Sequence, residues 1–134
     1  MMVAYGFKSA FWKPIQDRTK RQTIRNPRNR HAHPGERIQL YGKMRQPGCF
    51  KIIPDPVCIG VDMVEFDLRM FDRPPQLIVN GILIVGEAAD AYAEGDGFKP
   101  ILAFGAFEVM CRWWTLTHGR RVFHGIAIRW DDQP

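Results

Sequence analysis

The stretch QLIVNGILIV, residues 76–85, sets the direction of the fold because it encodes a tight reversal between two strands. Asn80-Gly81 stands between two β-prone runs, and this pair in that context is the strongest short signal for a two-residue hairpin turn. The two strands of a hairpin are antiparallel neighbours. We therefore expect an antiparallel sheet around this point of the chain.

Further strands are expected on both sides of the hairpin. Residues 57–69, VCIGVDMVEFDLR, form a long alternating run, and its change of phase near Asp62–Met63 predicts a bulge or bend. Residues 9–16 are interpreted as one helical turn or a loop. Shorter alternating or β-prone runs predict strands at residues 3–8, 21–25, 36–44 and 121–130.

One long helix is expected late in the chain. Apolar residues recur at spacings of three and four from Phe98 to Trp113, which is typical of a single buried helix face and assigns Trp113 to the core. Asp96 precedes this stripe as a candidate N-cap, and Gly119 is suited to end the helix. A shorter helix is expected around residues 86–93.

These elements predict an α+β fold within one domain, residues 1–134. The expected architecture is a small, mostly antiparallel β-barrel or curled sheet, with one long and one or two short helices packed on it. No stretch has the roughly 18–20 apolar residues that a membrane span needs, so no membrane association is expected. The first residues lack the features of a signal peptide, and we expect a cytoplasmic protein.

The cysteines do not indicate a disulfide framework or a zinc site. Cys49, Cys58 and Cys111 are an odd set without a Cys-x-x-Cys pair. Free cysteines are often buried as small apolar side chains, and we expect that here.

Charge is distributed unevenly along the chain. Residues 1–51 hold twelve Lys or Arg against two acidic residues, whereas residues 52–134 hold seven against twelve. A domain with one basic portion usually presents a positive patch that attracts polyanions or small anions. Many domains carry such patches without a specific ligand, so nucleic acid is only one interpretation.

The segment Lys20-x-x-Thr23-x-Arg25 contains three candidate reactive or anion-binding side chains within six residues. Thr23 and Arg25 share a face of a regular strand, and Lys20 joins them only from a turn before the strand. A hydroxyl between Lys and Arg can act as a nucleophile or bind an anion, and a lysine near other cations can transfer protons. The alternative is an edge strand with exposed, solubilising charges.

Four segments resemble the ASCH domain family in order and spacing: KRQTIR (20–25), PGERIQLY (34–41), AYAEGDGF (91–98) and FHGIAIRW (123–130). The resemblance covers roughly residues 5–130. It implies a PUA-like β-barrel with a cleft, and RNA or nucleotide ligands. The third segment resembles the acidic segment that leads into a helix in this family, and the fourth resembles the family's closing strand.

The resemblance also implies candidate catalytic residues. Some small bacterial members are amidohydrolases acting on N4-acylated cytidines, with a site formed by Lys, Thr and Glu, and a ribonuclease activity has been proposed for others. Carried onto this chain, these positions fall on Lys20, Thr23 and Asp96, with Glu94 as a substitute for the acid. Two departures bear on the transfer. Arg18 stands where the family's Gly-x-Lys-x-x-Thr-x-Arg motif has Gly, and Asp96 is one methylene shorter than Glu.

Basic residues in and around the polar loop at residues 26–35 are candidates for phosphate contacts, which set affinity without reading sequence. The alternative is a solvated loop. The aromatic candidates for base stacking are Trp12, Tyr41, Trp113, Trp114 and Trp130. Trp12 is the better candidate for a cleft wall, and Tyr41 faces either the cleft or the solvent. His31 and His33 lack a nearby carboxylate or Cys, so we expect neither a metal nor a cofactor. The candidate ligand-binding arginines are Arg18, Arg25, Arg28, Arg30, Arg37 and Arg45.

The leading interpretation is therefore an ASCH-type domain that binds RNA or a modified nucleoside in a cleft beside a basic patch. The alternative is an amidohydrolase acting on N4-acylated cytidine-type substrates, or a ribonuclease. A third class, a protein-interaction or inhibitor module that uses the basic face, stays open.

Overall fold

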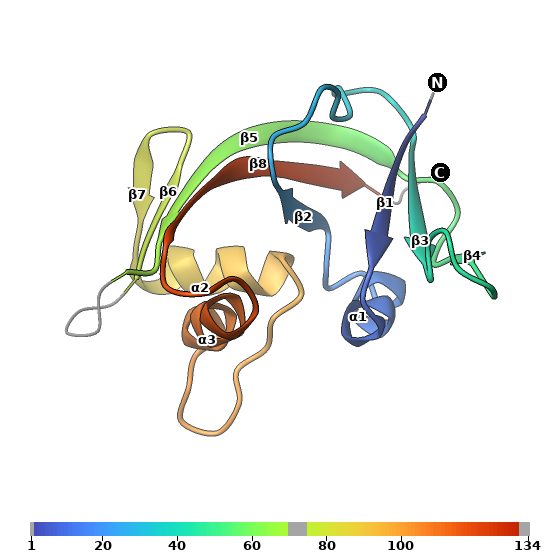
Figure 1. The fold of residues 1–134 in the computed structure, drawn as a ribbon. Helices are drawn as coiled ribbons and strands as arrows, with labels where there is room; N and C mark the ends of the chain where they lie inside the picture. The colour runs from blue at the N-terminus through green and yellow to red at the C-terminus, as the bar shows by residue number, and fades with distance from the viewer. Residues whose placement is uncertain (1, 70–74, 132–134) are drawn as a thin grey trace.

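The structure is a computed structural model that describes residues 2–69 and 75–131 and has an α+β fold (Figure 1). A three-stranded sheet has the order β1-β3-β4, and a five-stranded sheet has the order β2-β8-β5-β6-β7. The strands are β1 (Val3–Phe7), β2 (Gln22–Arg25), β3 (Ile38–Gly42), β4 (Phe50–Lys51), β5 (Val57–Asp67), β6 (Gln76–Val79), β7 (Ile82–Ile84) and β8 (Val122–Asp131). The helices are α1 (Trp12–Gln16), α2 (Gly86–Gly95) and α3 (Ala106–His118), with a 3-10 turn at Ser9–Phe11.

The mostly antiparallel character of the sheets is confirmed. Within the described residues, β1 and β3 are the one parallel pair of neighbouring strands. The two sheets meet where Arg37 forms a bridge with Val57 at the start of β5. No backbone ladder joins β1 to β2 in the described parts of the chain, so the curled sheet does not close into the barrel that the resemblance implies.

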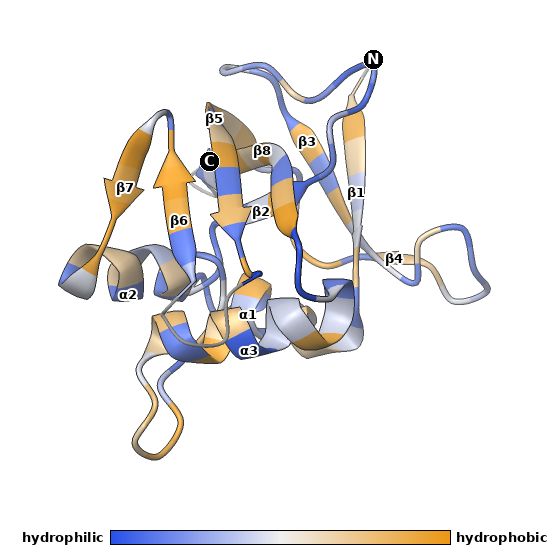
Figure 2. Cartoon of the chain, turned by 60° about the vertical axis from the view of Figure 1, so that its left-hand side comes forward, coloured by the Kyte–Doolittle hydropathy of each residue, from blue (hydrophilic) through white to orange (hydrophobic). Residues whose placement is uncertain are grey.

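Strands β5 and β8 form the spine of the molecule and arch over α2 and α3 (Figure 1). One face of this arch packs against the helices in a core that includes Val64, Phe66 and Met110. The ends of the arch that lie toward β1 and β3 contribute to a second core, which includes Tyr5, Leu40 and Trp130. The alternation of apolar and polar residues along the strands is visible in Figure 2.

The hairpin forms where the sequence predicts it. Asn80 and Gly81 both have positive φ, 52° and 81°, as a type I′ turn requires. The Asn80 side chain also fixes the turn to β5, because Oδ1 accepts from the Met63 amide at 2.8 Å and Nδ2 donates to Asp62 at 2.9 Å.

The predicted bulge near Asp62–Met63 is wrong, because the register of β5 with β8 continues without a break at these residues. Buried residues alternate without a break from Cys58 to Phe66, and the irregularity lies between Cys58 and Gly60. The sequence pattern misled because Asp62 looks like a solvent-facing residue. It is buried and accepts a hydrogen bond from Arg129 Nε at 2.7 Å.

The long helix begins later than predicted. It starts at Ala106, and Asp96 is the C-cap of α2, so the predicted N-cap role of Asp96 is wrong. Between the two helices, Ile101 and Phe104 exchange backbone hydrogen bonds in a tight turn, with Leu102 98% exposed. The shorter helix and the stop at Gly119 (φ 85°) are confirmed. Of the two tryptophans in α3, Trp114 is buried and Trp113 only half-buried.

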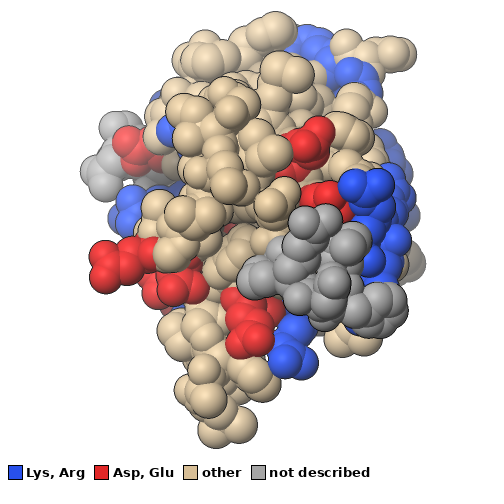
Figure 3. All heavy atoms as spheres, turned by 90° about the vertical axis from the view of Figure 1, so that its left-hand side faces the viewer, with Lys and Arg blue, Asp and Glu red and all other residues tan. Residues whose placement is uncertain are grey.

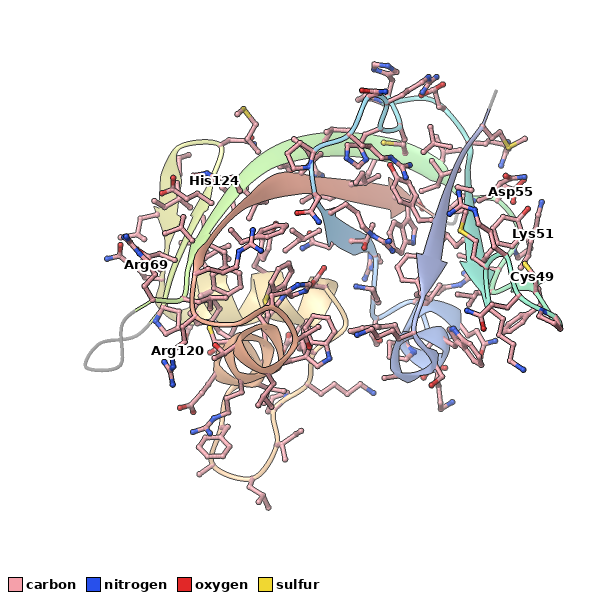
Figure 4. All side chains as sticks on the ribbon, in the orientation of Figure 1. Cys49, Lys51, Asp55, Arg69, Arg120 and His124 are labelled. Atoms are coloured by element: carbon pink, nitrogen blue, oxygen red, sulfur yellow. The ribbon has the colours of Figure 1, made fainter. Side chains whose placement is uncertain are left out.

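Two of the three cysteines are buried. Cys58 and Cys111 are buried as expected, but Cys49 is exposed, near Lys51 and Asp55 in Figure 4.

On the side of β6 and β7, acidic and basic side chains are interspersed (Figure 3). Helices in the described residues are all too short or too polar to cross a membrane.

The buried carboxylate of Asp62 yields a stability prediction. In the variant Asp62→Asn, the charge-assisted bond to Arg129 is lost and a donor faces a donor, so we expect the free energy of unfolding to fall by about 1–3 kcal/mol. Asp17→Asn is the control: Asp17 contacts Lys13 at 3.4 Å with both side chains exposed. Its loss should stay below about 1 kcal/mol. Denaturant unfolding measures both, and equal losses would contradict the assignment.

Candidate functional site

A pocket of about 260 Å³ lies between the end of β1, β2 and α3, where the sheet fails to close. We call it the seam pocket. Its polar lining includes Lys20, Thr23, Arg25 and Asp96, and its remaining walls are mainly aromatic. The structure thus brings together, in one hollow, the three residues that the resemblance implies are catalytic and the arginine beside them.

Lys20 and Asp96 form a buried pair. Lys20 lies in the turn before β2, where the sequence requires it if it is to join Thr23 and Arg25. Its Nζ donates to the Asp96 backbone oxygen at 2.7 Å and lies 3.4 Å from Oδ1, which also accepts from Gln22 Nε2 at 3.4 Å. Burial lowers the pKa of Lys20 and raises that of Asp96, whereas the attraction between the two opposes both shifts.

The end of α2 positions this pair. The Arg21 amide donates to the Gly95 carbonyl at 2.7 Å, which ties the turn before β2 to the helix end. Gly97 has a φ of +98°, and a Cβ added there would lie 2.9 Å from Cδ of Lys20. Glycine therefore allows both the turn after α2 and the close passage of the lysine side chain.

Arg25 lies half-buried beside the pair. Its Nε donates to Thr23 Oγ1 at 2.9 Å and its Nη2 to the Gly6 carbonyl at 2.6 Å. Its guanidinium also lies over the rings of Tyr5 and Phe7, 5.4 and 4.8 Å from their centroids. Burial lowers the pKa of Arg25 to about 10, so the group stays charged at neutral pH. No ion pair among the described residues includes Arg25.

Phe11 and Phe98, two members of the aromatic wall of the pocket, were not predicted from the sequence. Phe11, Phe98 and Trp113 form a cluster with ring centroids 5.3–5.8 Å apart, and His118 lies 5.8 Å from Trp113. Lys20 Nζ lies 4.7 Å from the Phe11 ring centroid. These rings come from three separate segments, so no local pattern marks them as partners. The assignment of Trp113 to the core missed its contribution to this wall.

Of the aromatic candidates from the sequence, Trp12, Tyr41 and Trp130 lie outside the lining of this pocket, whereas Trp113 and Trp114 belong to it. Trp12 donates from Nε1 to the Phe7 carbonyl at 2.9 Å and packs edge-on against Phe50. Tyr41 pairs with Lys51 between β3 and β4. Both residues belong to the three-stranded side of the molecule.

The arginines of the loop after β2 interact largely with the protein itself. Arg28 lies 4.7 Å from the Tyr5 ring centroid and donates to the Ala4 carbonyl at 3.4 Å. Arg30 forms an ion pair with Glu36. Arg28 reaches β1 near the seam pocket, whereas the charge of Arg30 is already compensated.

The remaining candidate arginines, Arg18, Arg37 and Arg45, are spread over the surface. Arg37 donates to the Asp55 carbonyl at 2.9 Å, and Arg45 is exposed between β3 and β4. Arg18 is exposed with a φ of 68°, and its carbonyl accepts a hydrogen bond from Arg21. None of these three arginines lines the seam pocket.

Both ring nitrogens of His31 take part in hydrogen bonds. His31 lies between two partners: Nε2 donates to the Asn26 carbonyl at 2.9 Å, which leaves Nδ1 to accept from the Tyr5 hydroxyl at 3.0 Å. Over residues 2–69 and 75–131, no group of three or more His, Cys, Asp or Glu is arranged to hold a metal ion.

Comparisons with protein-family models, curated proteins and solved structures found no match to this chain. The chemistry of the seam pocket is therefore inferred from its own geometry. A small hollow with aromatic walls, a hydroxyl, one buried ion pair and two further cations, Arg25 and Lys8, suits a flat, polar ligand that carries or develops negative charge.

Gly97 provides a test of how the buried pair is positioned. Gly97→Ala places a methyl group against Lys20 at a positive φ, and we expect it to lower the free energy of unfolding by about 1–3 kcal/mol. Gly95→Ala is the matched control, because a Cβ there meets nothing within 4 Å and φ is not positive. Its expected change is within about 1 kcal/mol of zero. Denaturant unfolding of both variants measures the difference, and equal effects would refute the close passage of Lys20.

Proposed function

We propose that this chain is an ASCH-type, PUA-like domain whose seam pocket binds one base of an RNA or a free modified nucleoside. The observation that carries the proposal is the half-buried guanidinium of Arg25, which no carboxylate of the described residues pairs, in the same small hollow as the Thr23 hydroxyl and the Phe11–Phe98–Trp113 rings. In this proposal, the open seam between β1 and β2 corresponds to the ligand-binding cleft that the resemblance implies.

The size and lining of the pocket favour a single base. Its volume, about 260 Å³, lies just below the roughly 300–1,000 Å³ of sites for larger small molecules. Aromatic side chains bind bases by stacking, which is worth about 1–3 kcal/mol per base. Trp113 is half-buried and therefore retains surface for such a contact.

Phosphate groups of the same ligand would meet cations at the pocket mouth. Lys8 is exposed and lines the pocket, and Arg28 lies on the Tyr5 ring near the end of β1. Contacts of this kind release counterions, so binding of an RNA should weaken steeply as salt rises. Arg37 and Arg45 are further from the pocket and contribute only if the RNA extends around the three-stranded sheet.

The binding proposal is tested with cytidine 5′-monophosphate and a short single-stranded RNA, using calorimetry. We expect Trp113→Leu to weaken both ligands by about 5- to 150-fold, the loss of one stacking contact. Arg25→Gln should weaken them comparably, provided that circular dichroism shows the variant folded. Arg45→Gln removes the same charge outside the pocket and should leave nucleotide binding unchanged. Binding that is indifferent to Trp113 and Arg25, or no binding at low salt, overturns the proposal.

A hydrolytic function is the second candidate, and the buried Lys20–Asp96 pair favours it. Because burial lowers the pKa of Lys20, its neutral amine is more accessible than that of a surface lysine. Neutral Lys20 can take a proton from water as the oxygen adds to the acyl carbon of an N4-acylated cytidine. Cleavage of the carbon–nitrogen bond then returns the proton to the leaving amine, while Asp96 holds Lys20 and Thr23 donates to the acyl oxygen.

The pH dependence of turnover tests this candidate. The active form of Lys20 is deprotonated, so kcat/KM for N4-acetylcytidine should rise with pH and level off below 10.5, the ordinary pKa of a lysine. Lys20→Arg keeps the positive charge but cannot lose it, and should abolish turnover; Lys8→Arg, on the exposed rim, should not. Turnover that survives Lys20→Arg contradicts the assigned role. Absence of wild-type turnover removes this candidate and leaves the binding proposal standing.

A further inference from the structure

The strand β2 presents its edge to the seam pocket. It is the outermost strand of the five-stranded sheet and pairs with β8 alone. Four consecutive residues, 23–26, line the pocket. Successive side chains of a strand point to opposite faces, so a continuous run of lining residues indicates that the backbone edge itself forms part of the wall.

The register with β8 identifies which backbone groups lie on that edge. The Trp130 amide donates to the Arg21 carbonyl at 3.0 Å, and Thr23 is opposite Ile128. In an antiparallel pair, hydrogen-bonded and non-hydrogen-bonded positions alternate, so residues 21, 23 and 25 bond to β8. The amide and carbonyl of Ile24 consequently point away from β8, toward the pocket. No other backbone bond to Ile24 is present in the described residues.

We infer that the main chain of Ile24 reads the hydrogen-bonding edge of the bound base. This inference rests on the proposed binding function and specifies the ligand: the Ile24 N–H donates to a ring nitrogen of the base, and the Ile24 carbonyl accepts from an adjacent amino group. Cytosine and adenine offer such an acceptor and donor on neighbouring atoms. The ligand is therefore a base with that edge free, stacked on the aromatic wall.

The surroundings of Ile24 suit this arrangement. Its side chain belongs to the core beneath the sheet, together with Phe98, so the backbone at this point is fixed. Thr23 and Arg25 project from the opposite face and bond to each other at 2.9 Å. A base that meets the edge between them has polar partners on one side and rings on the other. Leaving the Ile24 carbonyl unpaired should weaken binding about 5- to 150-fold.

The inference is tested by amide hydrogen exchange of the full chain, followed by NMR, with cytidine as the probe. The Ile24 amide should exchange rapidly in the free protein and at least about tenfold more slowly with saturating cytidine. The amides of Thr23 and Arg25, already bonded to β8, are internal controls and should be protected in both states. N4,N4-dimethylcytidine, which has no amino hydrogen, should bind about 5- to 150-fold more weakly than cytidine.

The outcomes separate the two proposals. If cytidine shifts the Trp113 indole resonance while Ile24 exchange stays unchanged, the base binds in the pocket but the main-chain reading is wrong. Equal affinity for N4,N4-dimethylcytidine, or an Ile24 amide that is already protected in the free protein, overturns the inference as well. If no nucleoside perturbs Trp113 or any pocket amide, the proposed binding function fails, and this inference with it.

Discussion

The guanidinium of Arg25 determines how β1 and β2 lie relative to each other. Neighbouring strands normally join by backbone hydrogen bonds, and the two strands then lie about 4.8 Å apart. Here the carbonyls of Gly6 and Ala4 accept from Arg25 and Arg28 instead, and side chains of that size hold the strands further apart. Removing Arg25 from water is costly, and its bond to Thr23 and the ring of Phe7 offset part of that penalty. The pocket is the space that this unclosed seam leaves.

The Lys20–Asp96 pair supplies the second constraint, because it joins segments 76 residues apart in the chain. A buried ion pair contributes little net stability over apolar packing, but breaking it by removing one partner is strongly destabilising. Asp96 accepts hydrogen bonds from Lys20 through both its backbone oxygen and its carboxylate, and the carboxylate also accepts one from Gln22. The end of α2 is thereby held against β2 and forms one wall of the pocket.

Apart from the two-residue β4, the strands and the hairpin could be predicted because each depends on a local pattern of alternation or turn residues, as at Asn80-Gly81. The start of α3 could not, since Ile101 and Leu102 fit the helical spacing yet lie exposed in a tight turn. For the site, the resemblance suggested Lys20, Thr23 and Asp96, and the structure places them in one pocket. The aromatic wall depends on α3 packing beside the turn at Ser9–Phe11, and no local pattern encodes that contact.

The density of positive charge alone would identify the loop at residues 26–35 as the anion-binding site. For anion binding, however, whether a cation is already paired with a carboxylate matters more than the number of cations. Arg30 already faces Glu36, so an incoming anion would have to displace a carboxylate to gain its interaction. Arg25 contacts no carboxylate within the described structure, and its surroundings have a lower dielectric constant than water. A negative or strongly polar group beside Arg25 therefore gains more free energy than the same group at the exposed loop. Arg25 should therefore contribute more to ligand affinity than the arginines of the loop do.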